Sequence, residues 1–270
     1  MITNRRMQKL SILPMALAGL TLGAATPAIW AAEFSEVELF FELNDTDGDL
    51  GIHASIDGEA YSMLEIEDPK ERTILLVKAS GRLAKQGLTQ LFLESAEPPF
   101  EELDPEEFFR RFPEGTYEIE ARTLKGEELE GTVELSHVLA APPANIKVNT
   151  EEAAENCDAP TLPSVSEPIT IDWNPVTTSH PEIGKSGPVE IVRYQFFVEQ
   201  GDLKFSVDLI PDLTPNTTVD VTQFQVPSEI IDLGNKDEPF KFEIIARTAS
   251  GNNTAVENCF TVETTSLEAR

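Results

Sequence analysis

The sequence has few positively charged residues. Lys and Arg number 20 among 270 residues, against 48 Asp and Glu, which gives a formal net charge of −28. This deficit makes the surface as a whole repel nucleic acid and anionic lipid, because proteins hold both polyanions mainly through Lys and Arg. The acidic excess favours either solubility or cation binding. The carboxylates are spread along the whole chain, so charge alone does not decide between these two.

Catalytic signatures are also absent. The sequence contains no Gly-x-Ser-x-Gly elbow and no glycine-rich phosphate loop. The histidines, His53, His137 and His180, are scattered, and no two have the helical spacing of zinc ligands. With 48 acidic residues, no particular pair of carboxylates for glycoside hydrolysis can be chosen. We predict that the protein is not an enzyme; a carboxylate-dependent hydrolase is the less favoured alternative.

Long apolar runs are lacking except near the N-terminus. There, Arg5, Arg6 and Lys9 precede an apolar run from Leu10 to Leu22, and small residues follow. This order is typical of a secretory signal peptide, and the run is short for a membrane span. We expect residues 1–32 to be removed, leaving a secreted or periplasmic protein without a stable membrane anchor. An uncleaved anchor is the alternative.

Cysteine occurs only at Cys157 and Cys259. In an exported protein an even number of cysteines indicates a disulfide. Closing a chain loop of this length stabilises a protein by roughly 4–5 kcal/mol in the chain-entropy description. Two buried free thiols are the alternative.

Residues 33–139 have mostly the pattern of strands. Apolar and polar residues alternate on both sides of an acidic turn, so this turn joins two strands as a hairpin. One short helix is expected where Asp104 caps the helix and Pro105 takes its first position. The strands are expected at residues 36–43, 52–56, 74–77, 91–93, 117–121 and 129–135.

The second half has the pattern of strands throughout. Adjacent prolines among small residues predict a linker over 140–149, which separates a domain of residues 33–139 from one of residues 150–264. Many short strands divided by Gly, Pro, Asn and Asp predict a sandwich. They are expected at residues 169–173, 189–200, 203–210, 218–226, 240–248 and 255–262.

A short repeat links the two halves. Residues 118–126 read EIEARTLKG and residues 243–251 read EIIARTASG. Each is a strand with one apolar face, followed by a turn glycine and a further strand. The repeat favours related sandwiches in both halves; chance similarity of two amphipathic strands is the alternative.

The second half resembles a fibronectin type III domain, from about Ala144 to Val262. The resemblance is carried by Trp173 in an early strand, by Tyr194 in a middle strand, and by the strand that begins at Phe240, where the family has tyrosine. It implies a seven-strand sandwich that serves as a spacer or binding module. For the whole chain we expect an all-β fold of two tandem β-sandwich domains of the immunoglobulin or fibronectin III-like kind, with one short helix in the first.

The acidic turn is the one candidate site in the sequence. Asp45, Asp47 and Asp49 alternate through a glycine-containing turn, and carboxylate oxygens are the ligands that Ca²⁺ prefers. The loop is not an EF-hand, because Leu50 and Ile56 stand where that loop requires Gly and Glu. We predict metal ligation by the three aspartates. A plain hairpin turn is the alternative, since Asp-Gly is itself a strong hairpin signal.

These observations predict a secreted, non-enzymatic protein that binds or presents a partner, with a turn stabilised by Ca²⁺. The expected partner is a protein or a glycan of unknown identity, and not a nucleic acid. A ligand-free structural or spacer protein is the main alternative.

Overall fold

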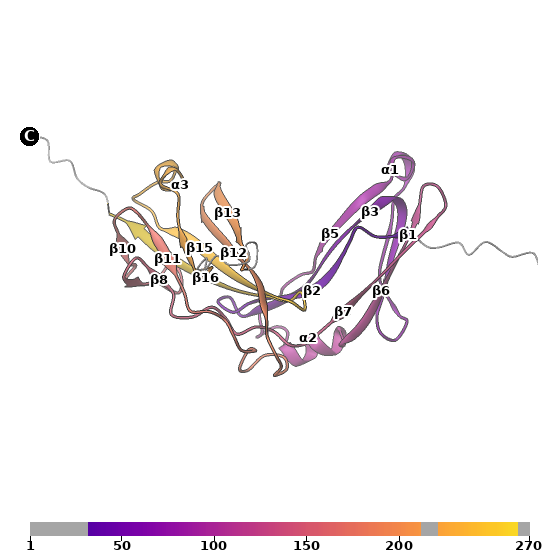
Figure 1. Ribbon diagram of the computed structural model, residues 1–270, viewed down its shortest axis with the longest axis horizontal. Coiled ribbons are helices and arrows are strands. Elements are labelled where there is room, and N and C mark those ends of the chain that lie inside the picture. Colours follow the sequence, from indigo (N-terminus) through magenta and orange to yellow (C-terminus); the bar gives the residue numbers. More distant parts are fainter. Residues whose placement is uncertain (1–31, 212–220, 264–270) are drawn as a thin grey trace, which may run out of the picture. The chain divides into compact units, whose positions relative to one another are not determined.

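The computed structural model describes residues 32–211 and 221–263, which belong to one compact unit, Ala31–Arg270 (Figure 1). Apart from its last residue, the predicted signal peptide lies outside these residues, and it stays a prediction. No helix within the described ranges is both long and apolar enough to span a bilayer. The fold is all-β and sandwich-like, as the sequence predicts.

The first half is a sandwich whose two sheets share one long strand. Strand β3 runs over 19 residues. Its first part pairs with β2 and β5, and its last part pairs with β4 and β6. The bounds are β1 Ala32–Glu33, β2 Glu36–Asn44, β3 Asp49–Glu67, β4 Thr73–Lys78, β5 Leu88–Glu94, β6 Gly115–Thr123 and β7 Glu128–Leu135.

Strand β3 passes from one sheet to the other near Gly58. The pairing register shifts between Asp57 and Tyr61. A Cβ at position 58 would lie 2.9 Å from the Phe34 side chain, so a larger residue here would have to displace that ring. Tyr61, directly after the bend, is fully buried between the two sheets.

Helix α2, Pro105–Arg111, closes the core of the first half and is the predicted helix. The Asp104 side chain caps it by accepting a hydrogen bond from the Glu106 amide at 2.8 Å. The rings of Phe108 and Phe109 pack edge-on against Phe41, with centroids 5.6 and 5.5 Å away. These aromatic contacts hold the helix on the sandwich.

The second half is a sandwich of two sheets. One contains β16, β15, β12 and β13 in that order, and the other contains β14, β11, β8 and β9. Trp173 and Phe196 lie between them with parallel rings, 6.3 Å apart. The bounds are β8 Lys147–Val148, β9 Glu151–Glu152, β10 Ser164–Val165, β11 Thr170–Asp172, β12 Ile191–Gln200, β13 Leu203–Leu209, β14 Gln223–Gln225, β15 Phe240–Thr248 and β16 Asn253–Val262.

Some elements differ from the expectation. Two further short helices form, α1 at Gly81–Gln86 and α3 at Ser228–Leu233. Helix α1 buries none of its side chains, so no apolar periodicity marks it in the sequence. The predicted linker, residues 140–149, contains β8, and Val148 is fully buried in the second core. The division of the chain into two domains stays a prediction.

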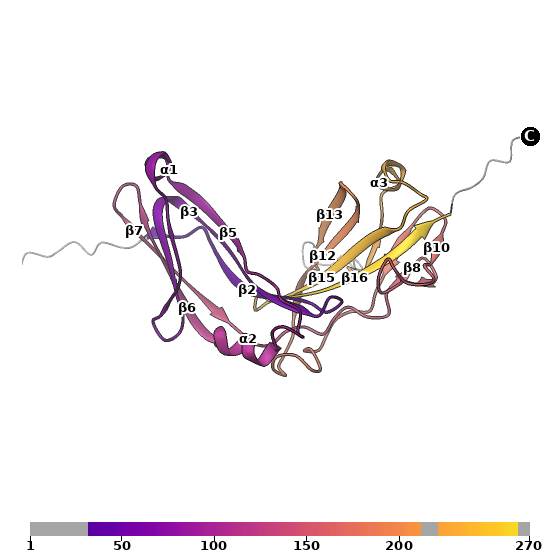
Figure 2. The ribbon, with the colours of Figure 1, turned by 180° about the vertical axis from the view of Figure 1, so that it is seen from behind.

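The two halves share one continuous sheet, because β16 pairs in parallel with β2 (Figures 1 and 2). The paired residues are Asn253 with Glu42, Thr254 with Leu43, and Ala255 with Asn44. The sequence pattern did not predict this join. The pairing places β2 and β16, which are far apart in the sequence, side by side.

Asn252, a fully buried residue, fixes this join by hydrogen bonds. Its Oδ1 accepts from the Phe41 amide at 2.9 Å, and its Nδ2 donates to the carbonyls of Ser136 and Val138 at 2.8 and 3.0 Å. The side chain therefore bonds to three backbone groups of the first half. A residue without this amide leaves those groups unpaired.

The sequence repeat corresponds to a repeated turn. The amides of Thr123 and Thr248 donate to the carbonyls of Glu127 and Asn252, each at 2.9 Å. The amide of each turn glycine donates back to its threonine, and both glycines have positive φ, 87° at Gly126 and 93° at Gly251. The residues shared by the two copies of the repeat thus form the same hairpin geometry in each half.

Candidate functional site

The acidic turn between β2 and β3 is held by Asn44. The Asn44 Oδ1 accepts from the amides of Thr46 and Asp47 at 3.1 and 3.2 Å, and its Nδ2 donates to Asp47 Oδ2 at 3.2 Å. The Gly48 amide donates to the Asn44 carbonyl, and Gly48 has φ of 68°. These contacts form an Asx turn within a hairpin, which explains why Asn and Gly stand at positions 44 and 48.

Asp45 points away from the other two aspartates, toward the second half of the chain. Its Oδ1 lies 2.9 Å from Nε2 of His180, whose side chain is buried. The Nδ1 of His180 accepts from the amides of Glu182 and Ile183, so the ring proton lies on Nε2 and is donated to Asp45. The Asp45 amide also donates to the Ala255 carbonyl of β16 at 2.9 Å. Asp45 therefore ties the turn to the second half.

Within residues 32–211 and 221–263, no group of three or more His, Cys, Asp or Glu side chains is placed so that it could hold a metal ion. Asp45 bonds to His180 and Asp47 bonds to Asn44. Asp49, the third predicted ligand, lies at the start of β3. The structure thus gives the first two aspartates protein partners, and calcium binding stays a prediction.

Replacing Asp45 by Ala is expected to lower the free energy of unfolding by about 1–2 kcal/mol, because it leaves a buried donor of His180 unpaired. Replacing Asp47 by Ala removes only an exposed hydrogen bond, and is expected to change stability by less than about 0.5 kcal/mol. Urea unfolding of both variants measures the difference. Equal losses in the two would contradict the role given to His180.

Several carboxylates crowd the exposed side of the sheet near the join. Burial, together with Glu97 and Asp47, raises the pKa of Asp49 to about 6. Burial, with Glu257 of β16 and Glu42 of β2, raises the pKa of Glu243 on β15 to about 7. Both carboxyls therefore change charge near neutral pH.

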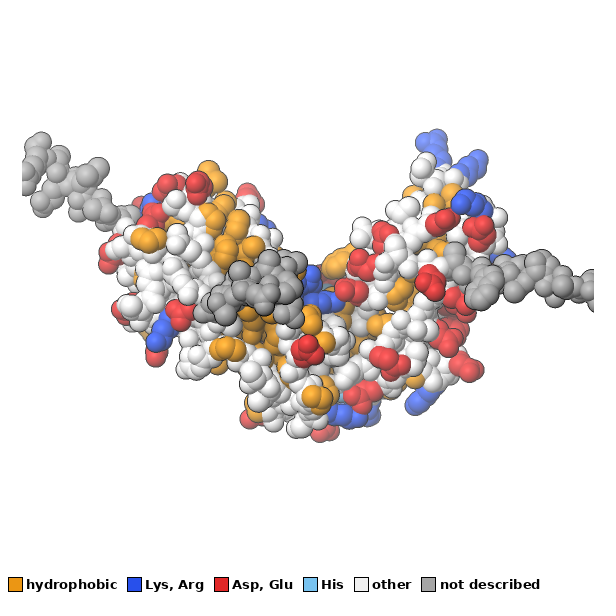
Figure 3. All heavy atoms as spheres, in the orientation of Figure 1, with side chains coloured by type: hydrophobic (Ala, Val, Ile, Leu, Met, Phe, Trp, Pro, Cys, Tyr) orange, Lys and Arg blue, Asp and Glu red, His pale blue; other side chains and the backbone are white. Residues whose placement is uncertain are grey.

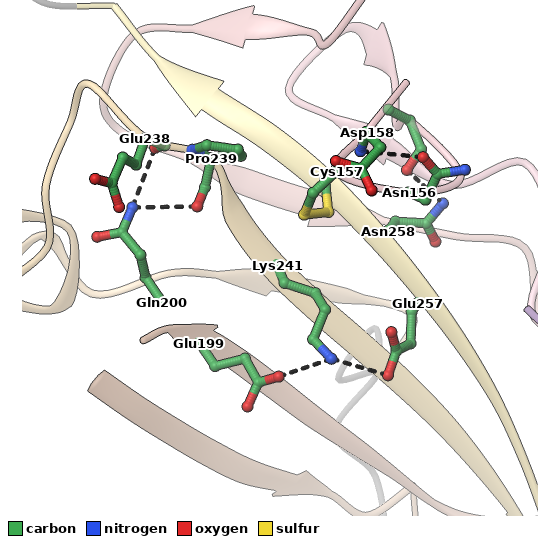
Figure 4. Close-up of a disulfide and its surroundings, with 12 residues drawn as sticks. Asn156, Cys157, Asp158, Glu199, Gln200, Glu238, Pro239, Lys241, Glu257 and Asn258 are labelled. Atoms are coloured by element: carbon green, nitrogen blue, oxygen red, sulfur yellow. Dashed lines mark hydrogen bonds and ion pairs between the residues drawn. A yellow bond between two sulfur atoms is a disulfide. The ribbon is translucent and has the colours of Figure 1, made fainter. Parts of the chain in front are cut away.

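The disulfide predicted between Cys157 and Cys259 is present, with Cα atoms 5.1 Å apart and a sequence separation of 102 (Figure 4). It fastens the loop before β10 to β16. The amide of Cys259 donates to the Ala154 carbonyl at 2.9 Å, so backbone pairing supports the bridge. Nearby, Lys241 lies between Glu199 and Glu257, at 2.8 and 3.0 Å.

A groove crosses the exposed face of the continuous sheet and is the candidate binding site. It takes outward-facing side chains from six strands of both halves: β2, β3, β5, β12, β15 and β16. The lining residues are Glu36, Glu38, Phe40, Glu42, His53, Ser55, Phe92, Glu94, Arg193, Gln195, Phe197, Ile245, Arg247 and Asn253. Four carboxylates and three phenylalanine rings dominate this surface.

Arg247 forms the floor of the groove. It is buried, its guanidinium lies 4.7 Å from the centre of the Phe40 ring, and its Nη2 pairs with Glu38 at 2.7 Å. Asn253 beside it donates to Glu42 at 2.7 Å. Arg247 is therefore already neutralised and stacked, and it fixes the positions of two side chains that line the groove.

The rim of the groove carries the side chains that remain open to a partner. Phe92 of β5 is 65% exposed. Glu36 and Glu94 make no ion pair in the part of the chain that the structure describes. Across the groove, Arg193 pairs with Asp208 at 3.3 Å. An exposed aromatic ring beside unpaired carboxylates suits a cationic ligand.

His53 supports the groove from within. Its ring lies 5.4 Å from the Phe40 ring, and its Nε2 lies 2.7 Å from Glu97 Oε1. Burial lowers the pKa of His53, but the hydrogen bond to Glu97 and the nearby carboxylates outweigh burial and raise it. The ring therefore holds Glu97 and Phe40 in place.

Sequence reasoning missed this groove, although one signal was present. In β2, Glu36, Glu38 and Glu42 occupy outward positions, and Phe40 interrupts them. An aromatic residue at a position where the alternation of the strand otherwise places polar side chains indicates a contact on the outer face of the sheet. The other lining residues are far apart in sequence, so only the sheet order brings them together.

No protein-family model and no curated protein matches this chain. Among solved structures, the chain is similar to a tetra-tandem repeat in the extending region of a large adhesion protein, with 11% identity and a TM-score of 0.27. That match covers 84% of this chain and 50% of the other. The chain is also similar to a 1.5-MDa bacterial ice-binding adhesin, with 11% identity and a TM-score of 0.25, covering 87% of this chain and 66% of the other.

A third similar structure is the C-terminal 282-residue fragment of intimin, bound to the intimin-binding domain of its receptor, with 11% identity and a TM-score of 0.23. The match covers 84% of this chain and 63% of that fragment. The chain thus spans half to two thirds of these structures. Their scores are too low to support an argument about function, and the fibronectin type III resemblance stays a prediction.

Proposed function

We propose that this protein is a non-enzymatic binding protein whose sheet groove holds a basic segment of a partner protein. The observation that carries the proposal is the groove itself, where exposed Phe92 stands beside Glu94 on β5 and Glu36 of β2 also belongs to the lining. Lysine and arginine side chains pair with carboxylates and stack on aromatic rings. A cationic peptide therefore matches this surface better than a glycan or an acidic ligand does.

The charge balance supports the same partner. The two arginines that line the groove are already paired, Arg247 with Glu38 and Arg193 with Asp208. Glu36 and Glu94 on its rim have no such partner in the described ranges. A basic segment would add the missing cations, and the acidic chain as a whole would attract it from a distance.

The disulfide supports a further proposal, that the protein works outside the cytoplasm, in the periplasm or after secretion. Binding at the groove requires no calcium at Asp45, Asp47 and Asp49. The structural or spacer alternative predicts no binding at the groove, so one experiment separates the two functions.

The test uses a fluorescent decalysine peptide and measures its anisotropy at 0.15 M salt. Replacing Phe92 by Ser is expected to weaken binding about fivefold, because a cation–π contact is lost. Replacing Glu94 by Gln is expected to weaken it about threefold, because a carboxylate partner is lost.

Two matched variants serve as controls. Leu233→Ser removes an apolar side chain that is 73% exposed, and Glu151→Gln removes an exposed carboxylate, both far from the groove lining. Neither is expected to change the affinity. If Glu151→Gln weakens binding as much as Glu94→Gln, the peptide senses net charge alone. If either control weakens binding as much as its counterpart, the proposed binding site is wrong.

A further inference from the structure

Residues 1–32 lack Asp and Glu, and one further long segment of this acidic chain contains no acidic residue. No Asp or Glu occurs from Thr73 to Leu93, although the chain has 48 of them. The segment forms β4, α1 and β5. Local charge here is therefore opposite in sign to that of the rest of the molecule.

The cations of this segment have no ion-pair partner in the part of the chain that the structure describes. Lys78, Arg82 and Lys85 are exposed and pair with no carboxylate among the described residues, whereas Arg72, shortly before, pairs with Asp68. Figure 3 shows Lys and Arg side chains gathered where Figure 1 places α1. Their charge is open to an external anion.

Apolar side chains lie among these cations. Leu76 is 56% exposed and Leu83 is 49% exposed, and α1 buries no residue. Leu124, from the β6–β7 hairpin, is 44% exposed and adjoins Gly87, where a Cβ would lie 3.0 Å from it. Exposing leucine side chains to water is unfavourable, so exposed leucines next to unpaired cations indicate a surface that contacts a partner.

We propose that this surface, the α1 tip, docks reversibly on an anionic lipid bilayer. The α1 tip consists of Leu76, Lys78, Arg82, Leu83 and Lys85. Lipid phosphates pair with the cations while the leucines enter the interface, and a bilayer offers both contacts at once. A soluble acidic protein offers the anions but needs a dedicated apolar pocket for the leucines.

The net charge of −28 opposes this docking only at long range. At physiological ionic strength the Debye length is about 8 Å, so carboxylates on distant strands are screened from the bilayer. The acid-free segment adds no carboxylate of its own to this surface, although Glu65 of β3 is the strand partner of Leu76. Three cations and two leucines give weak binding, which suits a contact that forms and breaks.

The test uses residues 31–270, which form one compact unit and exclude the N-terminal apolar run. Cosedimentation is measured with vesicles of phosphatidylcholine alone and with 30% phosphatidylglycerol. We expect binding only to the anionic vesicles, and loss of binding at 1 M salt. Arg82→Gln with Lys85→Gln is expected to lower the partition coefficient about 30-fold, and Leu83→Ser about tenfold.

Control variants keep the change in composition and move it elsewhere. Lys70→Gln with Lys147→Gln removes two other exposed cations, and Leu233→Ser removes another exposed leucine. Equal losses in these controls, or equal binding to both kinds of vesicle, would overturn the proposal. A third arm uses soluble polyglutamate: binding to it that depends on Arg82 and Lys85, without vesicle binding, would identify an acidic polypeptide as the partner instead.

Discussion

Replacing both Cys157 and Cys259 by Ala is expected to lower the free energy of unfolding by about 4–5 kcal/mol. The bridge closes a loop of 102 residues, which contains most strands of the second half. In the chain-entropy description, the unfolded chain gains the conformational freedom that the bridge removes. Urea unfolding, followed by the fluorescence of buried Trp173, measures the change.

The native chain unfolded in the presence of a reductant provides the control for this experiment. Its midpoint should match that of the double variant, because both lack the bridge and differ little in buried volume. A loss below about 1 kcal/mol in both would mean that the bridge constrains an already structured unfolded state. Tyrosine absorbance, to which Tyr61 and Tyr117 of the first half contribute together with Tyr194 of the second, follows the same transition. If it coincides with the Trp173 fluorescence, the two halves unfold together.

Replacing Glu243 by Gln is expected to stabilise the protein by about 2–3 kcal/mol at pH 8 and by almost nothing at pH 4. Burial and the neighbouring carboxylates of Glu257 and Glu42 raise the pKa of Glu243 from 4.5 to about 7. One pKa unit corresponds to about 1.4 kcal/mol of stability. We take less than the full value for this pKa shift, because the side chain is only half-buried and solvent screens its charge. The uncharged amide avoids this penalty.

The sign of the pH dependence follows from proton binding. Between pH 4.5 and about 7 the folded state binds the Glu243 proton and the unfolded state releases it, so stability falls as the pH rises through this window. In Glu243→Gln, the contribution of Glu243 to this fall of the unfolding free energy with pH should disappear. Urea unfolding at pH 4, 6 and 8 measures it.

Glu118 is the matched control, because it holds the same place in the sequence repeat and is exposed on β6. Glu118→Gln is expected to change stability by less than about 0.5 kcal/mol at every pH. If Glu243→Gln gives the same flat profile, the crowding of carboxylates at the join carries no energetic weight.

Local features of the fold were predictable from the sequence. The alternation around Val37 and Ile52 predicted the β2–β3 hairpin, and Asp104 with Pro105 predicted α2. These elements depend on periodicity, capping and turn chemistry within a few residues. The disulfide was predictable for a different reason, because only one pairing of two cysteines exists.

The candidate site was not predictable, because it depends on contacts between distant residues. Asp45 reaches a histidine 135 residues away, and Thr46 exchanges hydrogen bonds with Glu257 across 211 residues. The sequence therefore predicted a cluster of three aspartates where the structure directs Asp45 to His180. The groove likewise exists only once β16 lies beside β2.

The order of strands has a consequence for how this chain is made. Strand β2 is synthesised about 210 residues before its partner β16, which is the last strand among the described residues. Until the chain has been made as far as Ala255, one edge of β2 stays open and can pair with other strands. Variants that end before Asn253 should therefore aggregate, even though they contain strands β1–β7 of the first sandwich.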